Sequence, residues 1–143
     1  MRLLIIVLFI TAGCGAEYYN KRSDDLLIDP DLLPFLDEFR ADAALYNIPL
    51  EQPDVIVFRE MDDTYTAGMC VVAKLFSITY RDIFIDPSYQ YSPLLKPLMY
   101  HEFGHCLMNL EHTSDGIMQP YLQSSDYYKD DWDNLVESLF KSK

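Results

Sequence analysis

The sequence predicts an α+β fold in one domain, on three observations. Segments with apolar residues at three- and four-residue spacing, near both ends of the chain, are typical of amphipathic helices. Between them lie apolar, β-branched runs of strand length, separated by turn residues. The chain has 143 residues, of which 50% are hydrophobic, and this is enough for one apolar core.

The chain is strongly acidic. Its formal net charge is -12, from 11 basic and 23 acidic side chains, and no basic cluster offsets it. An acidic excess of this size repels phosphate backbones and anionic lipid headgroups. We therefore expect no nucleic acid among its partners.

The first fourteen residues, MRLLIIVLFITAGC, are typical of an export signal. Their apolar run, from Leu3 to Ile10, is far shorter than the ~20 residues that a membrane-spanning helix needs. Ala12 and Gly13 directly before Cys14 resemble the cleavage site of bacterial lipoproteins, in which the cysteine becomes the lipidated first residue. Thr11 stands where such sites usually have leucine, and the alternative is an ordinary cleaved signal peptide.

These signals divide the chain into a signal peptide (1–13), a lipidated N-terminus with a tether (14–29) and one domain (30–143). The protein is expected to be exported to the bacterial cell envelope, anchored to the membrane by its lipid, and monomeric. In that oxidising compartment Cys70 and Cys106 can form a disulfide, which would tie the segment around Cys70 to the one around His105. The alternative is two buried free thiols.

The first helix and the strands follow from periodicity and turn signals. A helix is expected over Asp31–Tyr46, with Pro34 in its first turn, where proline is tolerated. Strands are expected over Asp54–Arg59, Cys70–Phe76 and Ile78–Ile85. We expect Gly68 and the Asp62-Asp63 turn to separate the first two strands.

Two further helices complete the predicted domain. One is expected to begin between Pro93 and Pro97 and to continue through the first two histidines. The last is expected to begin at Ser124 or Ser125, residues that can cap a helix. Its apolar face is formed by Trp132, Leu135, Val136, Leu139 and Phe140.

The chemistry of the chain is concentrated in Tyr100–Pro120, YHEFGHCLMNLEHTSDGIMQP, which contains all three histidines. His101 and His105 are four residues apart, so on a helix both imidazoles project from one face and can bind one zinc ion at about 2.0–2.1 Å. Glu102 is rotated by about 100° from His101. Its carboxylate then lies beside the metal, where it can accept a proton from a zinc-activated water.

A catalytic zinc site needs a third protein ligand, and His112 is the leading candidate. On a continuous helix it would lie two turns beyond His105, roughly 10 Å along the axis, too far to share the metal. The helix is therefore expected to end between them at Asn109, which can adopt the left-handed conformation that reverses a chain. Glu111, and more distantly Asp115, are the alternative third ligands.

The HEFGH motif, the helix break, His112 and the run Gly116–Pro120 together resemble the metzincin group of zinc endopeptidases. Within this group, the chain is similar to small exported bacterial lipoproteins of metallopeptidase type. Met118 matches the methionine turn that lies beneath the metal in that group. The chain departs from the pattern at Met108, which replaces a glycine, and at His112, which lies one residue late, so that Glu111 holds the regular position.

The resemblance implies both a fold and an activity. The fold would be zincin-like: a small mixed β-sheet backed by helices, with an edge strand over the cleft and HExxH on the active-site helix. The Zn²⁺ ligands would be His101, His105 and His112. The protein would be a membrane-anchored zinc peptidase that acts on peptide or protein substrates, with Glu102 as its catalytic residue.

Two other functions stay open on the sequence. The chain could keep zinc, or the fold alone, as a catalytically silent binding or scaffold module, but Glu102 would then have no function beside the metal. It could also be a zinc hydrolase that acts on another amide or on an ester, because the attacking water is the same. For a peptidase, Tyr121 and Tyr100 are candidate hydrogen-bond donors to the oxyanion.

Overall fold

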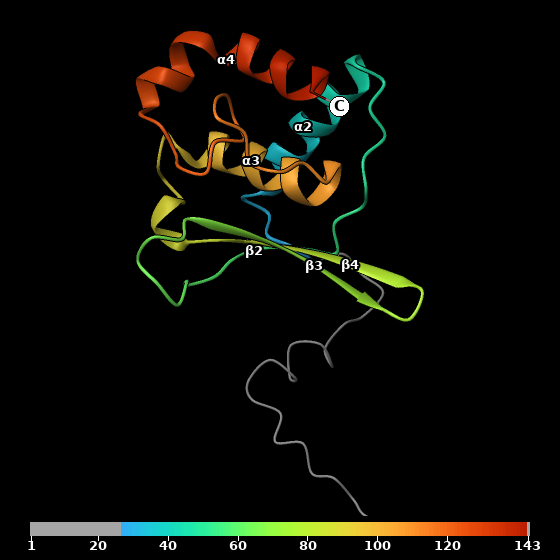
Figure 1. The fold of residues 1–143 in the computed structure, drawn as a ribbon. Helices are drawn as coiled ribbons and strands as arrows, with labels where there is room; N and C mark the ends of the chain where they lie inside the picture. The colour runs from blue at the N-terminus through green and yellow to red at the C-terminus, as the bar shows by residue number, and fades with distance from the viewer. Residues whose placement is uncertain (1–26, 143) are drawn as a thin grey trace, which may run out of the picture.

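The computed structural model describes residues 27–142, and its architecture is α+β, as predicted (Figure 1). The predicted signal peptide, Cys14 and the tether up to residue 26 lie outside the described residues. The described elements are β1 (Leu27–Ile28), α2 (Leu33–Leu45), β2 (Val55–Phe58), β3 (Gly68–Leu75), β4 (Ile78–Ile85), a 3-10 helix (Pro87–Tyr89), α3 (Leu95–Met108) and α4 (Ser125–Lys141).

The described strands form one mixed sheet in the order β1-β2-β4-β3. β2 is parallel to both β1 and β4, whereas β3 and β4 form an antiparallel hairpin. β3 is therefore an edge strand, and β4 is buried from Arg81 to Ile85. β1 lies within the predicted tether yet pairs with Val55 and Ile56. The sequence does not predict it, because two residues are too few to show a period.

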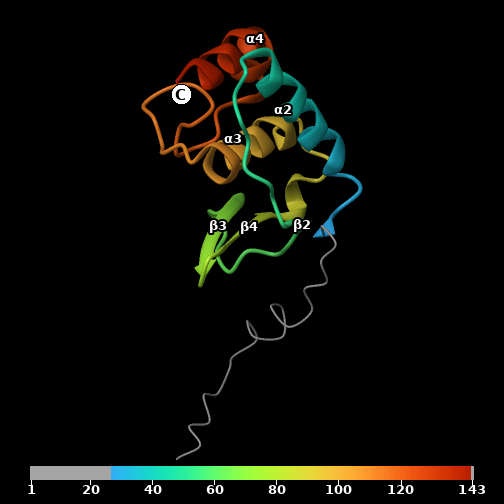
Figure 2. The same ribbon diagram turned by 90° about the vertical axis from the view of Figure 1, so that its right-hand side faces the viewer.

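Helices α2, α3 and α4 lie on the same side of the sheet (Figures 1 and 2). α3 packs on β3, β4 and α2. Aromatic rings join the helices: Phe39 of α2 contacts Tyr100 and Phe103 of α3 and Phe140 of α4, with ring centroids 5.0 to 5.1 Å apart. All four side chains are buried, and burial of each phenylalanine contributes roughly 1.5–3 kcal/mol. α3 is thus held between the sheet and the other helices.

The predicted element boundaries agree closely with the structure. β4 covers the predicted range, and α4 begins after Ser124, whose hydroxyl oxygen accepts a hydrogen bond from the Tyr127 N–H. α4 has one non-helical residue, Asp131, that the periodicity does not reveal. The prediction for Gly68 is wrong: it is the first residue of β3 and does not separate strands.

Across residues 27–142, none of the helices combines the length and the apolar character needed to cross a bilayer.

Candidate metal centre

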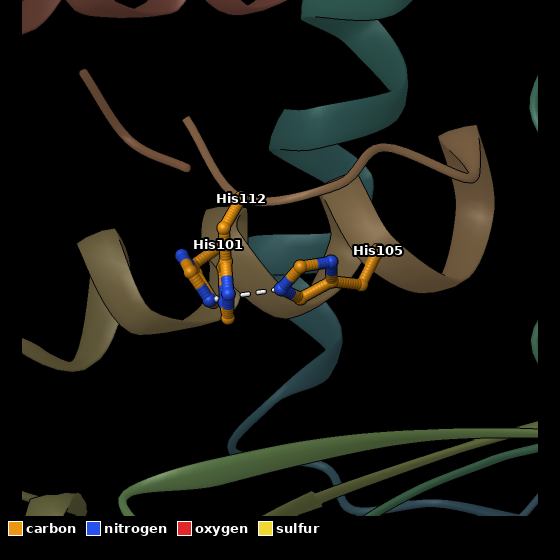
Figure 3. Close-up of side chains that lie close together, drawn as sticks. All are labelled: His101, His105 and His112. Carbon is orange, nitrogen blue, oxygen red and sulfur yellow. Dashed lines mark hydrogen bonds between the residues drawn. The ribbon is translucent and has the colours of Figure 1, made fainter. Parts of the chain in front are cut away.

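Three histidine side chains converge beside α3 (Figure 3). His101 and His105 lie on α3, one turn apart, and His112 reaches them from the loop that follows the helix. One nitrogen from each residue lies within 4.8 Å of the other two. The Nε2 atoms of His101 and His105 are 3.0 Å apart. The three histidines are therefore close enough to hold a metal ion.

The end of α3 brings His112 to this position. Asn109, the residue after the helix, has the predicted left-handed conformation, with φ 55° and ψ 40°. The Leu110 N–H then donates to the Gly104 carbonyl at 3.0 Å, which closes the turn. Both acidic alternatives, at positions 111 and 115, are exposed and lie outside the group of converging ligands. The chain reversal thus delivers the histidine and not a carboxylate.

Backbone carbonyls fix the protonation of two imidazoles. His101 Nδ1 lies 2.8 Å from the Ile117 carbonyl oxygen, and His105 Nδ1 lies 2.7 Å from the Leu110 carbonyl oxygen. A carbonyl oxygen can only accept a hydrogen bond, so each Nδ1 carries a proton and donates it. Each neutral ring then presents an Nε2 atom without a proton, and two nitrogen lone pairs face one another across 3.0 Å.

This arrangement fits a bound cation. Protonating an Nε2 atom would relieve the repulsion, but burial lowers the pKa of His101 to about 4 and also lowers the pKa of His105. A tetrahedral metal ion at about 2.0–2.1 Å separates its ligand nitrogens by roughly 3.3 Å, close to the separation of 3.0 Å between these two Nε2 atoms. Metal-binding histidines commonly donate their other nitrogen proton to a carbonyl, as both do here.

The segment that resembles a methionine turn packs against the same helix. Met118 is buried, and a Cβ atom at Gly104 would lie 2.4 Å from the Met118 sulfur. Glycine at the fourth position of HEFGH is therefore needed for this contact. Ile117, the preceding residue, supplies the carbonyl that holds His101. The sequence does not predict a role for Gly104, because that role depends on a contact with a distant segment.

Glu102 lies where α3 meets β3. It is 4% exposed, and burial raises the pKa of its carboxyl group to about 8, opposed by a hydrogen bond from the Cys70 backbone N–H. A Cβ atom at Gly68 would lie 2.7 Å from Oε1 of Glu102. β3 can approach the carboxylate this closely because Gly68 has no side chain.

A disulfide joins β3 to α3 beside this carboxylate. It links Cys70 and Cys106, the pair that the sequence predicted, with the two sulfur atoms 2.07 Å apart. Cys106 lies one turn after Glu102 on α3, and Cys70 lies two residues after Gly68 on β3. The bond therefore fixes the part of the strand that packs on Glu102.

A cleft of about 680 Å³ opens beside the metal centre, lined by the three histidines and Glu102. The start of β3 and the segment after Met118 form its other walls. Tyr121 lines this cleft and is 78% exposed. Tyr100 is buried in the core instead, where it donates a hydrogen bond to Asp42 at 2.6 Å and burial raises its pKa. Of the two candidate oxyanion donors, Tyr121 is the one at the cleft.

Comparisons with known proteins identify no relative. No protein-family model matches the chain, and no curated protein or solved structure matches it significantly.

Proposed function

We propose that this protein is a zinc-dependent hydrolase, an exported, membrane-anchored peptidase of metzincin type. The proposal rests on one observation. The unprotonated Nε2 atoms of His101 and His105 converge with His112 in a cleft, which the buried carboxylate of Glu102 also lines. A metal used for stability alone would more often be enclosed by four protein ligands. In the described part of the chain, the converging group consists of three histidines and no further cysteine or carboxylate.

His101, His105 and His112 are the residues that would hold the zinc ion. Imidazole is a preferred zinc ligand, and three protein ligands leave one tetrahedral position open. Zinc bound there supplies a Lewis acid, which lowers the pKa of a coordinated water and favours the ionised form of a nearby carboxyl group. The carbonyls of Ile117 and Leu110 keep two of the rings in the tautomer that binds a metal through Nε2.

Glu102 is the residue that moves the proton. Because burial raises its pKa to about 8, its carboxyl group can change protonation state near neutral pH. It accepts a proton from the attacking water and donates it to the amine that leaves when the peptide C–N bond breaks. The Cys70 N–H and the closely packed Gly68 backbone hold the carboxylate in place for both transfers.

The edge strand β3 supports a polypeptide as the substrate. Among the described strands, β3 pairs with β4 alone, and its first residues line the cleft together with Glu102. An extended peptide can add to such an edge through backbone hydrogen bonds, which select a polypeptide chain more than any one side chain. Tyr121, exposed in the same cleft, is the candidate donor to the oxyanion.

A catalytically silent zinc-binding module is the second candidate. The burial of Glu102 favours this second candidate. A general base must contact the water that it deprotonates, and the Glu102 side chain is only 4% exposed. Both candidates bind zinc, but the peptidase alone turns over a substrate. Measuring zinc content and hydrolysis together therefore separates them.

The test begins with the purified protein, which should contain about one zinc ion per chain and lose it to a chelator. Glu102→Gln should keep the zinc and lower hydrolysis of unfolded protein or a peptide library by about 100-fold or more, as loss of a general base does. Glu38→Gln, the same change at an exposed position on α2, should alter neither property. Zinc binding without wild-type turnover would favour the silent module, and a chain that stays metal-free with zinc available would reject both.

The third ligand has a test of its own. His112→Ala should weaken zinc binding strongly, because two imidazoles then remain, whereas Glu111→Ala should change it little. Competition with a chelator of known affinity measures both. If Glu111→Ala abolishes binding and His112→Ala does not, the carboxylate is the ligand and the regular metzincin spacing holds.

A further inference from the structure

Arg81 is a buried residue that the proposed mechanism does not use. It lies on β4 and is 8% exposed. Its backbone N–H donates to the Asp54 carboxylate at 2.7 Å, and its carbonyl accepts the Asp54 N–H at 2.8 Å. These bonds fix the main chain of Arg81 beside the start of β2, and its guanidinium group extends to the end of α3.

The guanidinium group holds the last turn of α3. Nη1 donates to the Cys106 carbonyl at 2.7 Å and to the side-chain oxygen of Asn109 at 3.0 Å. The Glu51 carboxylate lies 3.7 Å from Nη2. A positive charge at this end of a helix also interacts favourably with the last backbone carbonyls, which have no partner within the helix. The side chain thus contacts both the helix end and the residue that reverses the chain.

Two parts of the metal centre depend on this reversal. Leu110, next to Asn109, supplies the carbonyl that accepts the Nδ1 proton of His105. His112 follows two residues later and joins the converging group. The conformation of Asn109, with φ 55°, is one that asparagine adopts more readily than most residue types, although it remains uncommon for a residue other than glycine. A hydrogen bond from Arg81 to its side-chain oxygen favours this conformation over extended alternatives.

We propose that Arg81 is a positioning residue for the metal centre, which holds Asn109 in the left-handed turn that brings His112 to His101 and His105. Arg81 acts through the turn, since its guanidinium group donates hydrogen bonds to Cys106 and Asn109. The inference rests on the metal centre of the proposed function, but it concerns the arrangement of the histidines and not hydrolysis.

Zinc affinity, measured by chelator competition with zinc alone as the probe, is the first test. Arg81→Met keeps the length of the side chain and removes its hydrogen bonds, and we expect the affinity to fall by about 10-fold, as for other residues that orient metal ligands. Electrostatics alone predicts the opposite sign, because removing a positive charge near the site favours a bound cation. Arg59→Met is the matched control, since the Arg59 guanidinium group lies over the Phe84 ring, and it should leave the affinity unchanged.

A double-mutant cycle tests whether the effect passes through His112. In a His112→Ala background, Arg81→Met should cause a clearly smaller loss of zinc affinity, because the ligand that the turn delivers is already absent. Asn109→Gly should keep the wild-type affinity, because glycine adopts the left-handed conformation without the hydrogen bond. Arg81→Gln has a shorter side chain that removes the contacts with Cys106 and Asn109, and it serves if Arg81→Met does not fold. Wild-type affinity in the folded Arg81 variant, or an equal loss with and without His112, overturns the proposal.

A measurement on the metal-free protein separates this proposal from the proposed function. The Nδ1 proton of His105, bound to the Leu110 carbonyl, should give a slowly exchanging proton resonance in the wild type and in Arg59→Met. The resonance should be lost in Arg81→Met. That result supports the positioning role even in a chain that binds no zinc, which would reject the proposed function alone. A resonance that persists in Arg81→Met overturns the positioning role whatever the zinc content.

Discussion

The two ends of β3 are built in contrasting ways. At its start, a glycine makes room for the Glu102 carboxylate, and a disulfide ties Cys70 to α3. At its other end the hairpin with β4 extends away from the helices (Figure 1), and Leu75 and Phe76 are 56% and 90% exposed. Residue types at the first end are therefore restricted by contacts with another element, whereas the exposed side chains at the second end have no such restriction.

A substitution should therefore have a larger effect at the start of β3 than at the hairpin. A single added carbon at Gly68 meets a neighbour within 3 Å, whereas the side chains of the hairpin turn meet solvent. The turn also contains a left-handed non-glycine residue, Phe76, with φ 55°. We expect changes at the start of β3 to act on the site and on stability, and changes at the hairpin to act on the turn.

The largest effect is expected from the carboxyl group that β3 helps to bury. Burial raises the Glu102 pKa from 4.5 to about 8, so the folded chain binds this proton more tightly than the unfolded chain. The resulting stabilisation is complete below the unfolded pKa of 4.5 and is lost as the pH rises through 8. Glu102→Gln has no such titration. The free energy of unfolding of Glu102→Gln, relative to that of the wild type, should therefore increase by about 5 kcal/mol across this range.

Denaturant unfolding of both metal-free proteins, from pH 4 to pH 9, measures this difference. Every other titratable group is common to both chains, so contributions that do not depend on Glu102 cancel when the two curves are subtracted. A difference that stays constant with pH would show that Glu102 ionises in the folded chain as easily as in the unfolded one.

Removing the disulfide should have the next largest effect. Cys70 and Cys106 are 36 residues apart, and closing a loop of this size stabilises a chain by about 4 kcal/mol, chiefly through the unfolded state. Replacing both cysteines by alanine should lower the free energy of unfolding by about 2–4 kcal/mol. A thiol reductant should destabilise the wild type by a similar amount and leave the double variant unchanged. Equal stability of the oxidised and reduced wild type would contradict this.

Gly68→Ala should have a smaller effect on stability, which arises from a clash with Glu102. The new Cβ atom would lie 2.7 Å from Oε1 and 2.9 Å from Cγ, so the side chain or the strand must move. Overpacking of this kind costs about 1–3 kcal/mol. The cost should largely disappear in a Glu102→Ala background, where the clashing atoms are absent. Val72→Ala, at an exposed position of the same strand, is the control and should change stability by less than about 0.5 kcal/mol.

The sequence predicts most of the helices and strands because local periodicity determines them. It predicts the end of α3 at Asn109 for a different reason. His112 can join the other histidines only if the helix ends, and asparagine is suited to the left-handed turn. Residue type and spacing therefore suffice to predict three features: the end of the helix, the group of three histidines and the pairing of the two cysteines.

Other features depend on contacts between distant segments, which no local pattern records. Glycine is typical of turns, so the sequence places Gly68 in a turn. Its packing on Glu102 follows from the position of β3 beside α3. Gly104 occupies a variable position of HExxH, and its importance comes from the Met118 sulfur. Arg81 is one charged residue in a strand, and its function depends on the end of α3 lying next to β4.

The smallest effect is expected at the hairpin, where it should have the opposite sign. β3 and β4 are joined by a two-residue turn, because Leu75 pairs with Ile78, and Phe76 takes the first turn position with a positive φ of 55°. Glycine is favoured there in tight hairpins, and a bulky residue is strained. Since the Phe76 side chain is 90% exposed, Phe76→Gly loses little burial and should stabilise the chain by about 0.5–1 kcal/mol in denaturant unfolding. Leu75→Gly, in the adjoining strand position, should destabilise it because glycine is unfavourable within a strand. If Phe76→Gly also destabilised the chain, the ring would hold the hairpin through contacts, and the two ends of β3 would differ less than their exposure indicates.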